Sequence, residues 1–197
     1  MKLVGCVIPC YLGNSTTIDV IKKTLKLVSF VVLVDDNCPN QTGKKVLGSI
    51  KNKKLVVIKN DINRGVGYSA KRGINYLLSI DCDIIIKIDA DGQMNPELIP
   101  SIIEPIIKGE SDAVKGNRFN SIEDIMDMPK LRIIGNLGLS FLNKLSTGYW
   151  ELFDPTNGFI AFNSNTLRRI RLHKLDDRYF FESDLLFQCS LANIYFK

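Results

Sequence analysis

The sequence lacks the residues that usually build a zinc site or a disulfide framework. It contains a single histidine, His173, and no two of its five cysteines stand in a C-x-x-C spacing. Because zinc in proteins is held by clustered Cys and His ligands, we expect no zinc centre. The cysteine count is odd and several of these residues lie in or beside apolar runs, which predicts reduced and mostly buried thiols at Cys6, Cys10, Cys38, Cys82 and Cys189.

The sequence also lacks a long apolar run. No stretch of 18 apolar residues is present, so we expect no transmembrane helix within the chain. Met1 and Lys2 lead directly into a strand-like segment and not into a secretory leader, which predicts a cytoplasmic location. The last residues, 193–197, resemble the start of a strand, so we expect a chain that is truncated before its natural continuation.

Neither sign of charge dominates the chain. Its 26 basic and 21 acidic residues give a net charge of +5 without a Lys/Arg-rich run, and no nucleic-acid-binding signature is present. We therefore expect no nucleic-acid partner, whereas a diphosphate ligand or an anionic membrane surface suits this modest basic excess. With 197 residues, of which 45% are hydrophobic, the chain has the size of a single domain.

Short apolar runs alternate with segments of helical periodicity. Strands without polar alternation that are separated by helices indicate an α/β fold, with a mostly parallel central sheet and helices on both faces. The expected strands are 3–8, 30–34, 55–58, 83–88 and 112–115, and a further short strand lies within 153–162. The expected helices are 16–28, 43–51, 67–79, 97–107, 131–145, 164–171 and 179–192.

Polar residues follow most of the expected parallel strands. In open parallel sheets, ligands bind beyond the carboxyl ends of the strands. The polar groups that coincide with this edge are Pro9–Tyr11, Asp35-Asp36, Asn63-Arg64, Asp89 with Asp91, and Asn117-Arg118. This coincidence predicts one ligand site assembled from several strand ends.

The most informative of these groups lies within residues 84–97. An isoleucine-rich run delivers Asp89 and Asp91 to a turn, and a helix start with Asn95 as a possible cap follows. Side chains two apart at a strand end point the same way, so the two carboxylates can converge on one hard cation, with Gln93 as a further oxygen ligand. Such a cation commonly holds a diphosphate. Taken alone, the same residues also fit a solvated turn.

Three other patterns allow more than one interpretation. Asp35-Asp36-Asn37 is either an Asx turn or a carboxylate that accepts hydrogen bonds from a base or ribose. The glycines of 65–70 follow the third strand, which favours a helix start packed near phosphate over a dinucleotide-binding fold. The segment 131–145 is too short to span a bilayer, and it is either a core helix or a helix on a membrane surface.

The charged residues after position 117 are less decisive. Arg118, Lys130 and Arg132 are each compatible with a solvated surface, but together they form a candidate phosphate site. Glu182 and Asp184 lie two apart, so on a helix their directions differ by about 200°. We therefore expect at most one of these two carboxylates to face the ligand site.

The motifs in combination resemble the family-2 glycosyltransferases of GT-A fold. The branch most similar is that of dolichyl-phosphate mannose synthase and the bacterial polyprenyl-phosphate glycosyltransferases, and the resemblance runs over nearly the whole chain. The motifs that carry it are Val7–Tyr11, Val34–Asn37, Asn63–Gly65, Asp89–Gln93, Gly116–Phe119, Thr156–Phe159 and Phe181–Leu186. Where the family usually has Asn-Glu after the first motif, this sequence has Leu12-Gly13.

The resemblance implies a role for each matching residue. On the donor side, the residues expected to bind the nucleotide-sugar are Pro9, Tyr11, Asp36, Arg64, Gly65 and Asp89. Mg²⁺ or Mn²⁺ is expected on Asp89 and Asp91, with Gln93 as an additional ligand. On the acceptor side, the expected phosphate- or sugar-binding residues are Arg118, Lys130, Arg132 and Asn157. The expected catalytic carboxylates are Asp91, Glu182 and Asp184.

The implied function is inverting transfer of a sugar from a UDP- or GDP-linked donor to a polyprenyl phosphate. A phosphate acceptor is already anionic near neutral pH and needs no protein base. Two alternatives stay open: extension of a surface polysaccharide at a sugar hydroxyl, with Glu182, Asp184 or Asp154 as general base, and a non-catalytic nucleotide-sugar binding domain.

The resemblance also implies an organisation for the whole protein. We expect a single catalytic domain over 1–197, with a nucleotide-binding part at about 1–118 and an acceptor part at about 119–197. The membrane helices usual in this family lie beyond the last residue, so we expect the full-length protein at the inner face of the cell membrane. The sequence leaves the oligomeric state open.

Overall fold

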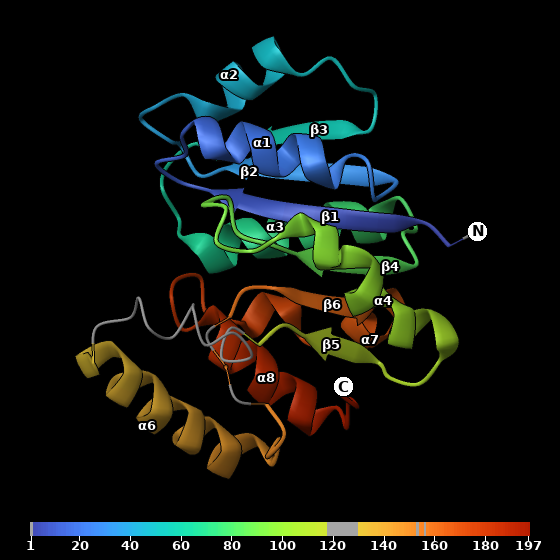
Figure 1. The fold of residues 1–197 in the computed structure, drawn as a ribbon, viewed down its shortest axis with the longest axis vertical. Coiled ribbons are helices and arrows are strands. Elements are labelled where there is room, and N and C mark those ends of the chain that lie inside the picture. The colour runs from blue at the N-terminus through green and yellow to red at the C-terminus, as the bar shows by residue number, and fades with distance from the viewer. Residues whose placement is uncertain (1, 118–129, 153, 156) are drawn as a thin grey trace.

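The computed structural model describes residues 2–117, 130–152, 154–155 and 157–197. A six-stranded sheet with the strand order β3-β2-β1-β4-β6-β5 forms its centre (Figure 1). The strands are β1 Val4–Cys10, β2 Phe30–Asp35, β3 Leu55–Lys59, β4 Ile84–Lys87, β5 Ala113–Lys115 and β6 Ile160–Asn163. The expected α/β class, with a mostly parallel sheet, is confirmed.

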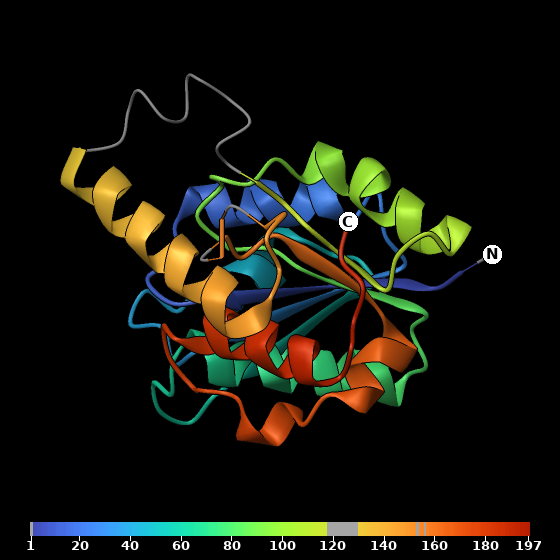
Figure 2. The same ribbon diagram turned by 90° about the horizontal axis from the view of Figure 1, so that it is seen from below.

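Helices cover both faces of this sheet (Figure 2). The helices are α1 Ser15–Thr24, α2 Thr42–Ser49, α3 Val66–Ser79, α4 Ile99–Lys108, α6 Lys130–Thr147, α7 Ser164–Arg169 and α8 Phe181–Leu191. Two short 3₁₀ helices, Pro96–Leu98 and Leu172–Lys174, complete the regular structure that is described. Helices α1 and α4 lie on one face, and α3, α7 and α8 lie on the other.

The buried apolar residues form one core on each side of the sheet. On one side, residues of β1, β2 and β4 pack against α1, α2 and α4, for example Ile8 and Leu33 with Val46 and Ile103. The opposite faces of the same strands pack against α3 and α8. Because both faces are covered, these strands are apolar at nearly every position. All five cysteines are buried and free, as expected.

Strands β3, β2, β1 and β4 pair in parallel, as the sequence indicates. Strand β1 continues through Pro9 to Cys10, two residues beyond its expected end. The carbonyl of Cys10 accepts the N–H of Asp36 on the β2 side, so the nitrogen of Pro9 faces the β4 side. Pairing with β4 ends at Val7, so the proline removes no ladder hydrogen bond.

The expected fifth parallel strand does not pair with β4. Strand β6 lies between β4 and β5 and is antiparallel to both, so the chain after residue 119 contributes a strand to the central sheet. The apolar residues 160–162 of β6 are buried, which explains why this strand occupies an interior position. Near the chain end, Phe196 forms an isolated parallel bridge with Ala113 of β5.

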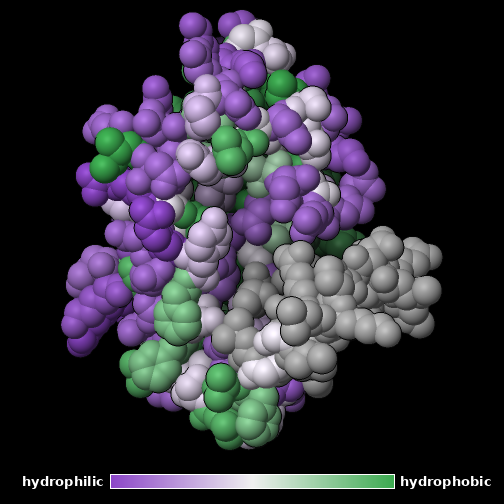
Figure 3. Space-filling model, turned by 90° about the vertical axis from the view of Figure 1, so that its left-hand side faces the viewer, coloured by the Kyte–Doolittle hydropathy of each residue, from purple (hydrophilic) through white to green (hydrophobic). Residues whose placement is uncertain are grey.

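Helix α6 confirms the expected helical segment after residue 130, and over residues 140–147, where burial is described, its pattern is the reverse of a core helix. Ser140, Asn143 and Thr147 are buried, and the amide of Asn143 donates to the hydroxyl of Ser183 on α8 at 3.3 Å. Phe141 and Leu142 are 55% and 61% exposed. Apolar side chains gather over α6 and α8 at the lower end of the face drawn in Figure 3. No helix within the described ranges is long and apolar enough to cross a membrane.

Candidate active site

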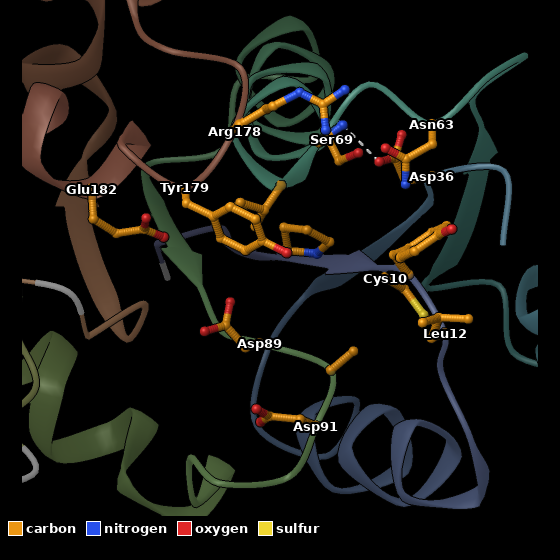
Figure 4. Close-up of a pocket in the computed structure, with 15 residues that line it drawn as sticks. Cys10, Leu12, Asp36, Asn63, Ser69, Asp89, Asp91, Arg178, Tyr179 and Glu182 are labelled. Atoms are coloured by element: carbon orange, nitrogen blue, oxygen red, sulfur yellow. Dashed lines mark hydrogen bonds between the residues drawn. The ribbon is translucent and has the colours of Figure 1, made fainter. Parts of the chain in front are cut away.

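A cavity of about 870 Å³ opens at the carboxyl ends of the strands (Figure 4). Its wall is formed by residues that follow β1, β2 and β4, by the start of α3 and by the segment that leads into α8. Ligand and cofactor cavities in proteins commonly measure about 300–1,000 Å³. The cavity therefore lies where the parallel-sheet topology predicts a ligand site, and it has a suitable size for a nucleotide-sized ligand.

Asp89 and Asp91 follow β4 and line the same side of this cavity (Figure 4). The turn that presents them depends on Gly92, which has a φ of +83° and packs against Thr16, where a side chain would collide. The N–H of Gln93 donates to Oδ1 of Asp91 at 3.0 Å and fixes the turn. Asp91 is exposed and lines the cavity.

Lys87 lies behind the two aspartates at the end of β4. Its side chain is 1% exposed, and its ammonium lies 2.7 Å from Oδ1 of Asp89 and 2.9 Å from Oε1 of Glu182. Burial alone lowers the pKa of Lys87, but the carboxylates of Asp89 and Glu182 outweigh burial, and the net shift is upward. A charged lysine thus joins β4 to α8 beneath the cavity.

Gly158 packs directly on this ion pair. A Cβ atom added at Gly158 would collide with Oδ2 of Asp89 and with Nζ of Lys87. Only a residue without a side chain permits this approach, because these two atoms belong to charged groups held in an ion pair and are costly to displace. The glycine of the Thr156–Phe159 motif is therefore explained by its contact with Lys87 and Asp89.

Lys115 on β5 is a second buried lysine close to the same carboxylates. Burial lowers the pKa of Lys115 to about 8, against the opposing effect of Glu182 and Asp154. Its ammonium donates to the backbone carbonyl of Asn157. The side-chain oxygen of Asn157 accepts the N–H of Phe159 at 2.9 Å, and Asn157 is 3% exposed. Asn157 thus shapes its own turn and is not part of the cavity lining.

The two aspartates after β2 stabilise two different loops. Asp35 accepts the N–H groups of Cys38 and Gly43, both at 2.7 Å, and so caps the start of α2. Asp36 accepts the side-chain amide of Asn60 at 2.7 Å, the N–H of Arg64 at 2.9 Å and the N–H of Gly65 at 2.7 Å. Asp36 lines the cavity, and these bonds take up most of the hydrogen-bonding capacity of its carboxylate.

Gly65 and Gly67 allow the segment before α8 to lie against the start of α3. Side chains at these positions would collide with the backbone carbonyls of Asp177 and Asp176, respectively. The N–H of Tyr68 donates to the carbonyl of Asp177 at 3.0 Å, which ties the two segments together. The glycine pattern therefore reflects close backbone packing. Gly65 itself still lines the cavity.

This contact brings Arg178 and Tyr179 to the cavity wall (Figure 4). Lys71 on α3 forms an ion pair with Asp177 at 2.6 Å, which holds the segment in place. Tyr179 is 91% exposed at the rim. Sequence reasoning missed both residues, although their position directly before the Phe181–Leu186 motif is a signal that identifies them.

Most sequence-predicted donor-side residues do meet at the cavity. The predicted site residues that line it are Pro9, Tyr11, Asp36, Gly65, Asp89, Asp91 and Glu182. Arg64 does not line it, because its guanidinium lies over the ring of Tyr68 at 4.9 Å from the centroid. The side chain of Gln93 is also outside the lining.

Only one of the two carboxylates of α8 faces the cavity, as their helical spacing indicates. Glu182 lines the cavity, whereas Oδ2 of Asp184 accepts the N–H of Asp176 at 2.9 Å. The structure therefore does not bring Asp184 to the site. The predicted phosphate-binding residues Arg118, Lys130 and Arg132 lie outside the residues whose side chains the structure describes.

The aspartates fit a divalent cation that shares its ligands with a diphosphate. Mg²⁺ is commonly bound through one or two carboxylates together with substrate phosphates. Asp91 offers an exposed carboxylate, and Asp89 is 33% exposed although its Oδ1 is paired with Lys87. Among the residues described, no group of three or more His, Cys, Asp or Glu residues is arranged to hold a metal by itself. The donor set thus suits a cation completed by phosphate oxygens.

Comparison with known proteins gives a consistent result. The family model described as Glycosyl transferase family 2 matches residues 6–171. The UDP-N-acetylglucosamine–dolichyl-phosphate N-acetylglucosaminyltransferase of Methanococcus voltae is 36% identical over 115 residues, which are 58% of this chain and 45% of that protein. The undecaprenyl-phosphate mannosyltransferase of Micrococcus luteus is 27% identical over 162 residues, which are 81% of this chain and 65% of that protein. The matched part thus spans less than two thirds of either relative.

Among solved structures, glucosyl-3-phosphoglycerate synthase from Mycobacterium tuberculosis, in complex with Mn²⁺, UDP and phosphoglyceric acid, is similar with a TM-score of 0.71. The sequence identity is 19%, and the similarity covers 94% of this chain and 63% of that chain. This likeness confirms the fold, which is the GT-A fold expected from the sequence motifs.

Proposed function

The chain belongs to glycosyl transferase family 2, and we propose that it transfers a sugar from a nucleoside diphosphate sugar to a polyprenyl phosphate, with inversion at the anomeric carbon. The observation that carries this proposal is the position of Asp89 and Asp91 on the cavity wall, at the carboxyl end of β4. Exposed carboxylates at this edge suit a diphosphate bound through a divalent cation.

The donor would lie across the cavity with its nucleoside on the β1 and β2 side. Pro9, Tyr11 and Asp36 line that side and would contact the base and ribose. Asp91, assisted by Asp89, would hold Mg²⁺ or Mn²⁺, which supplies charge neutralisation for the leaving diphosphate. Arg178 lies across the cavity from these aspartates (Figure 4), and its guanidinium suits a phosphate oxygen.

The acceptor would enter with its negative charge already present. The second pKa of a phosphomonoester is about 6, so a polyprenyl phosphate is largely dianionic at neutral pH and needs no general base. One of its oxygens attacks the anomeric carbon, the bond from that carbon to the diphosphate oxygen breaks, and the nucleoside diphosphate leaves. The ion pair between Lys87 and Glu182 supports this acceptor, because it already engages the carboxylate that a hydroxyl acceptor would need as its base.

Helix α6 supports a lipid acceptor independently of the cavity. It exposes Phe141, Leu142 and Leu145 while its polar residues Asn143 and Thr147 are buried. An apolar surface of this kind suits contact with a polyprenyl chain or with the interfacial region of a bilayer. We therefore propose that the reaction takes place at a membrane surface. The Methanococcus voltae and Micrococcus luteus relatives are named for transfer to dolichyl and undecaprenyl phosphate.

A radiolabelled transfer assay tests the proposal. The chain is incubated with Mn²⁺, a panel of UDP- and GDP-linked sugars and a short polyprenyl phosphate, and an oligosaccharide with free hydroxyls is offered in parallel. We expect label in the lipid phosphate product with one of these donors. Label only in the oligosaccharide would favour the polysaccharide-extending alternative, and donor binding without transfer would favour a nucleotide-sugar binding domain.

A further inference from the structure

The ammonium of Lys87 joins the β4 side of the cavity wall to the α8 side by charge. Asp89 belongs to the end of β4, and Glu182 belongs to the start of α8. Lys87 contacts one oxygen of each, at 2.7 Å and 2.9 Å. The side chains of Lys87 and Glu182 are 1% and 11% exposed, so solvent screens this interaction only weakly.

A buried lysine in this position has a specific consequence for the two carboxylates. Without the ammonium, Asp89 and Glu182 would face each other as like charges in a largely buried environment, which is strongly unfavourable. With it, each carboxylate has one oxygen fixed while the rest of the group lies at the cavity wall. The orientation of both carboxylates therefore depends on a residue that does not itself line the cavity.

We infer that Lys87 is a positioning residue for the transfer reaction. It fixes Asp89 for the diphosphate end of the donor, and it holds Glu182 as an ion-pair partner at the opposite wall and not as the proton acceptor of the reaction. The inference rests on the proposed function for the identity of the ligand, a nucleoside diphosphate.

The surroundings of Lys87 support this role over a purely structural one. A side chain at Gly158 would collide with the Lys87–Asp89 ion pair. The turn that contains Gly158 therefore packs directly on this ion pair. In the sheet, Lys87 and Lys115 both pair with Ile160 of β6, from opposite sides. Lys115, however, donates to the backbone carbonyl of Asn157, so the two lysines have different partners within one buried cluster.

Lys115 thus supplies a matched control. Lys87→Met and Lys115→Met each remove one buried ammonium from the two strands that flank β6, with a side chain of similar length left in place. Only Lys87→Met releases a residue that faces the donor. Glu182→Gln, alone and combined with Lys87→Met, removes the charge that Lys87→Met leaves unpaired.

The test measures UDP and GDP binding in the presence of Mn²⁺ by calorimetry, together with the thermal unfolding midpoint of each variant. We expect Lys87→Met to weaken nucleotide binding about 10–100-fold, as is typical of residues that orient metal-binding groups. Lys115→Met is expected to lower the unfolding midpoint while nucleotide affinity stays within about threefold. Adding Glu182→Gln to Lys87→Met is expected to raise the midpoint again without restoring nucleotide affinity.

Three results separate the possible failures. Wild-type affinity in Lys87→Met, or an equal loss in Lys115→Met, would show that Lys87 only stabilises the fold and would overturn the inference. A loss of transfer of about 100-fold or more in Glu182→Gln at unchanged donor affinity would identify Glu182 as a proton acceptor and would also overturn it. A wild-type chain that binds neither nucleotide would overturn the proposed function itself.

Discussion

The ammonium of Lys87 on β4 lies 2.9 Å from the carboxylate of Glu182 on α8, and it lies 2.7 Å from that of Asp89. One buried cation therefore connects two residues that are far apart in the sequence and that line the same cavity. Substitutions at this cluster and on the nucleotide side of the cavity should therefore change stability or nucleotide binding.

Gly158→Ala should disrupt the ion pairs that Lys87 forms with Asp89 and Glu182. The new methyl group would collide with Nζ of Lys87 and Oδ2 of Asp89, so we expect a loss of about 1–3 kcal/mol of stability and weaker nucleotide binding. Chemical denaturation and calorimetry measure the two effects. Gly135→Ala on α6 is the control, because nothing lies within 4 Å of its added Cβ and the substitution should stabilise the helix slightly. Equal behaviour of the two variants would contradict the close packing.

Lys115 should make stability depend on alkaline pH. Burial lowers its pKa to about 8 in the folded chain, whereas an unfolded lysine titrates near pH 10.4. Between about pH 8 and 10.4 the unfolded chain binds more protons at this residue, so its contribution to stability should rise with pH. The free energy of unfolding at several pH values, compared between the wild type and Lys115→Met, isolates this residue. A difference that stays constant from pH 7.5 to 10 would refute the shift.

Asp36→Asn should loosen the loop at the start of α3. The carboxylate accepts the N–H groups of Arg64 and Gly65, and an amide group cannot replace all of its acceptor positions. We expect a loss of about 1–3 kcal/mol of stability and reduced nucleotide affinity. Asp61→Asn, an exposed position in the same connection, is the control and should have little effect on either. An unchanged thermal midpoint in Asp36→Asn would be inconsistent with this role.

Arg178→Ala should weaken donor binding while leaving the fold intact. The side chain lines the cavity across from Asp89 and Asp91 and is exposed, so its removal leaves no buried group unpaired. Loss of one charge-assisted contact to phosphate predicts a decrease in UDP or GDP affinity of about tenfold or more. Arg168→Ala is the matched control, because Arg168 pairs with Asp81, which follows α3 outside the cavity lining. Equal nucleotide affinities in the two variants would exclude Arg178 from the donor site.

Asp91→Asn should remove the dependence of nucleotide binding on divalent cations. The exposed carboxylate of Asp91 is the better available cation ligand, since Asp89 shares its Oδ1 with Lys87. Titration of UDP or GDP with and without Mn²⁺ measures the difference, which should be large in the wild type and small in the variant. Binding that is independent of Mn²⁺ in the wild type would contradict the proposed metal site.

The parallel pairing of the first four strands and the edge at which the ligand site forms were predictable from the sequence. Apolar runs such as 84–86, with Asp89 and Asp91 a few residues later, specify buried strands with a polar end. The helical spacing of Glu182 and Asp184 also predicted correctly that only one of them faces the cavity. These features depend on local periodicity, which a sequence displays directly.

Features that depend on distant partners were not predictable in the same way. Strand β6 is inserted between β4 and β5. The periodicity of a sequence identifies strands but does not determine which strands pair with each other. From the sequence, Gly65 was assigned only to a phosphate contact. Its packing against the backbone of 176–178 was not visible there, because that segment is remote in sequence. The ion pair between Lys87 and Glu182 was not predicted either, because its two residues are remote in sequence.

The most direct test of the account is the rate of sugar transfer to a short polyprenyl phosphate between pH 6 and 9, measured for the wild type and Glu182→Gln. The account predicts a lipid-linked product, a rate that reaches a plateau above the phosphate pKa of about 6, and a Glu182→Gln rate within about tenfold of the wild type. Product formed only on a sugar hydroxyl, together with a loss of about 100-fold or more in Glu182→Gln, would contradict it.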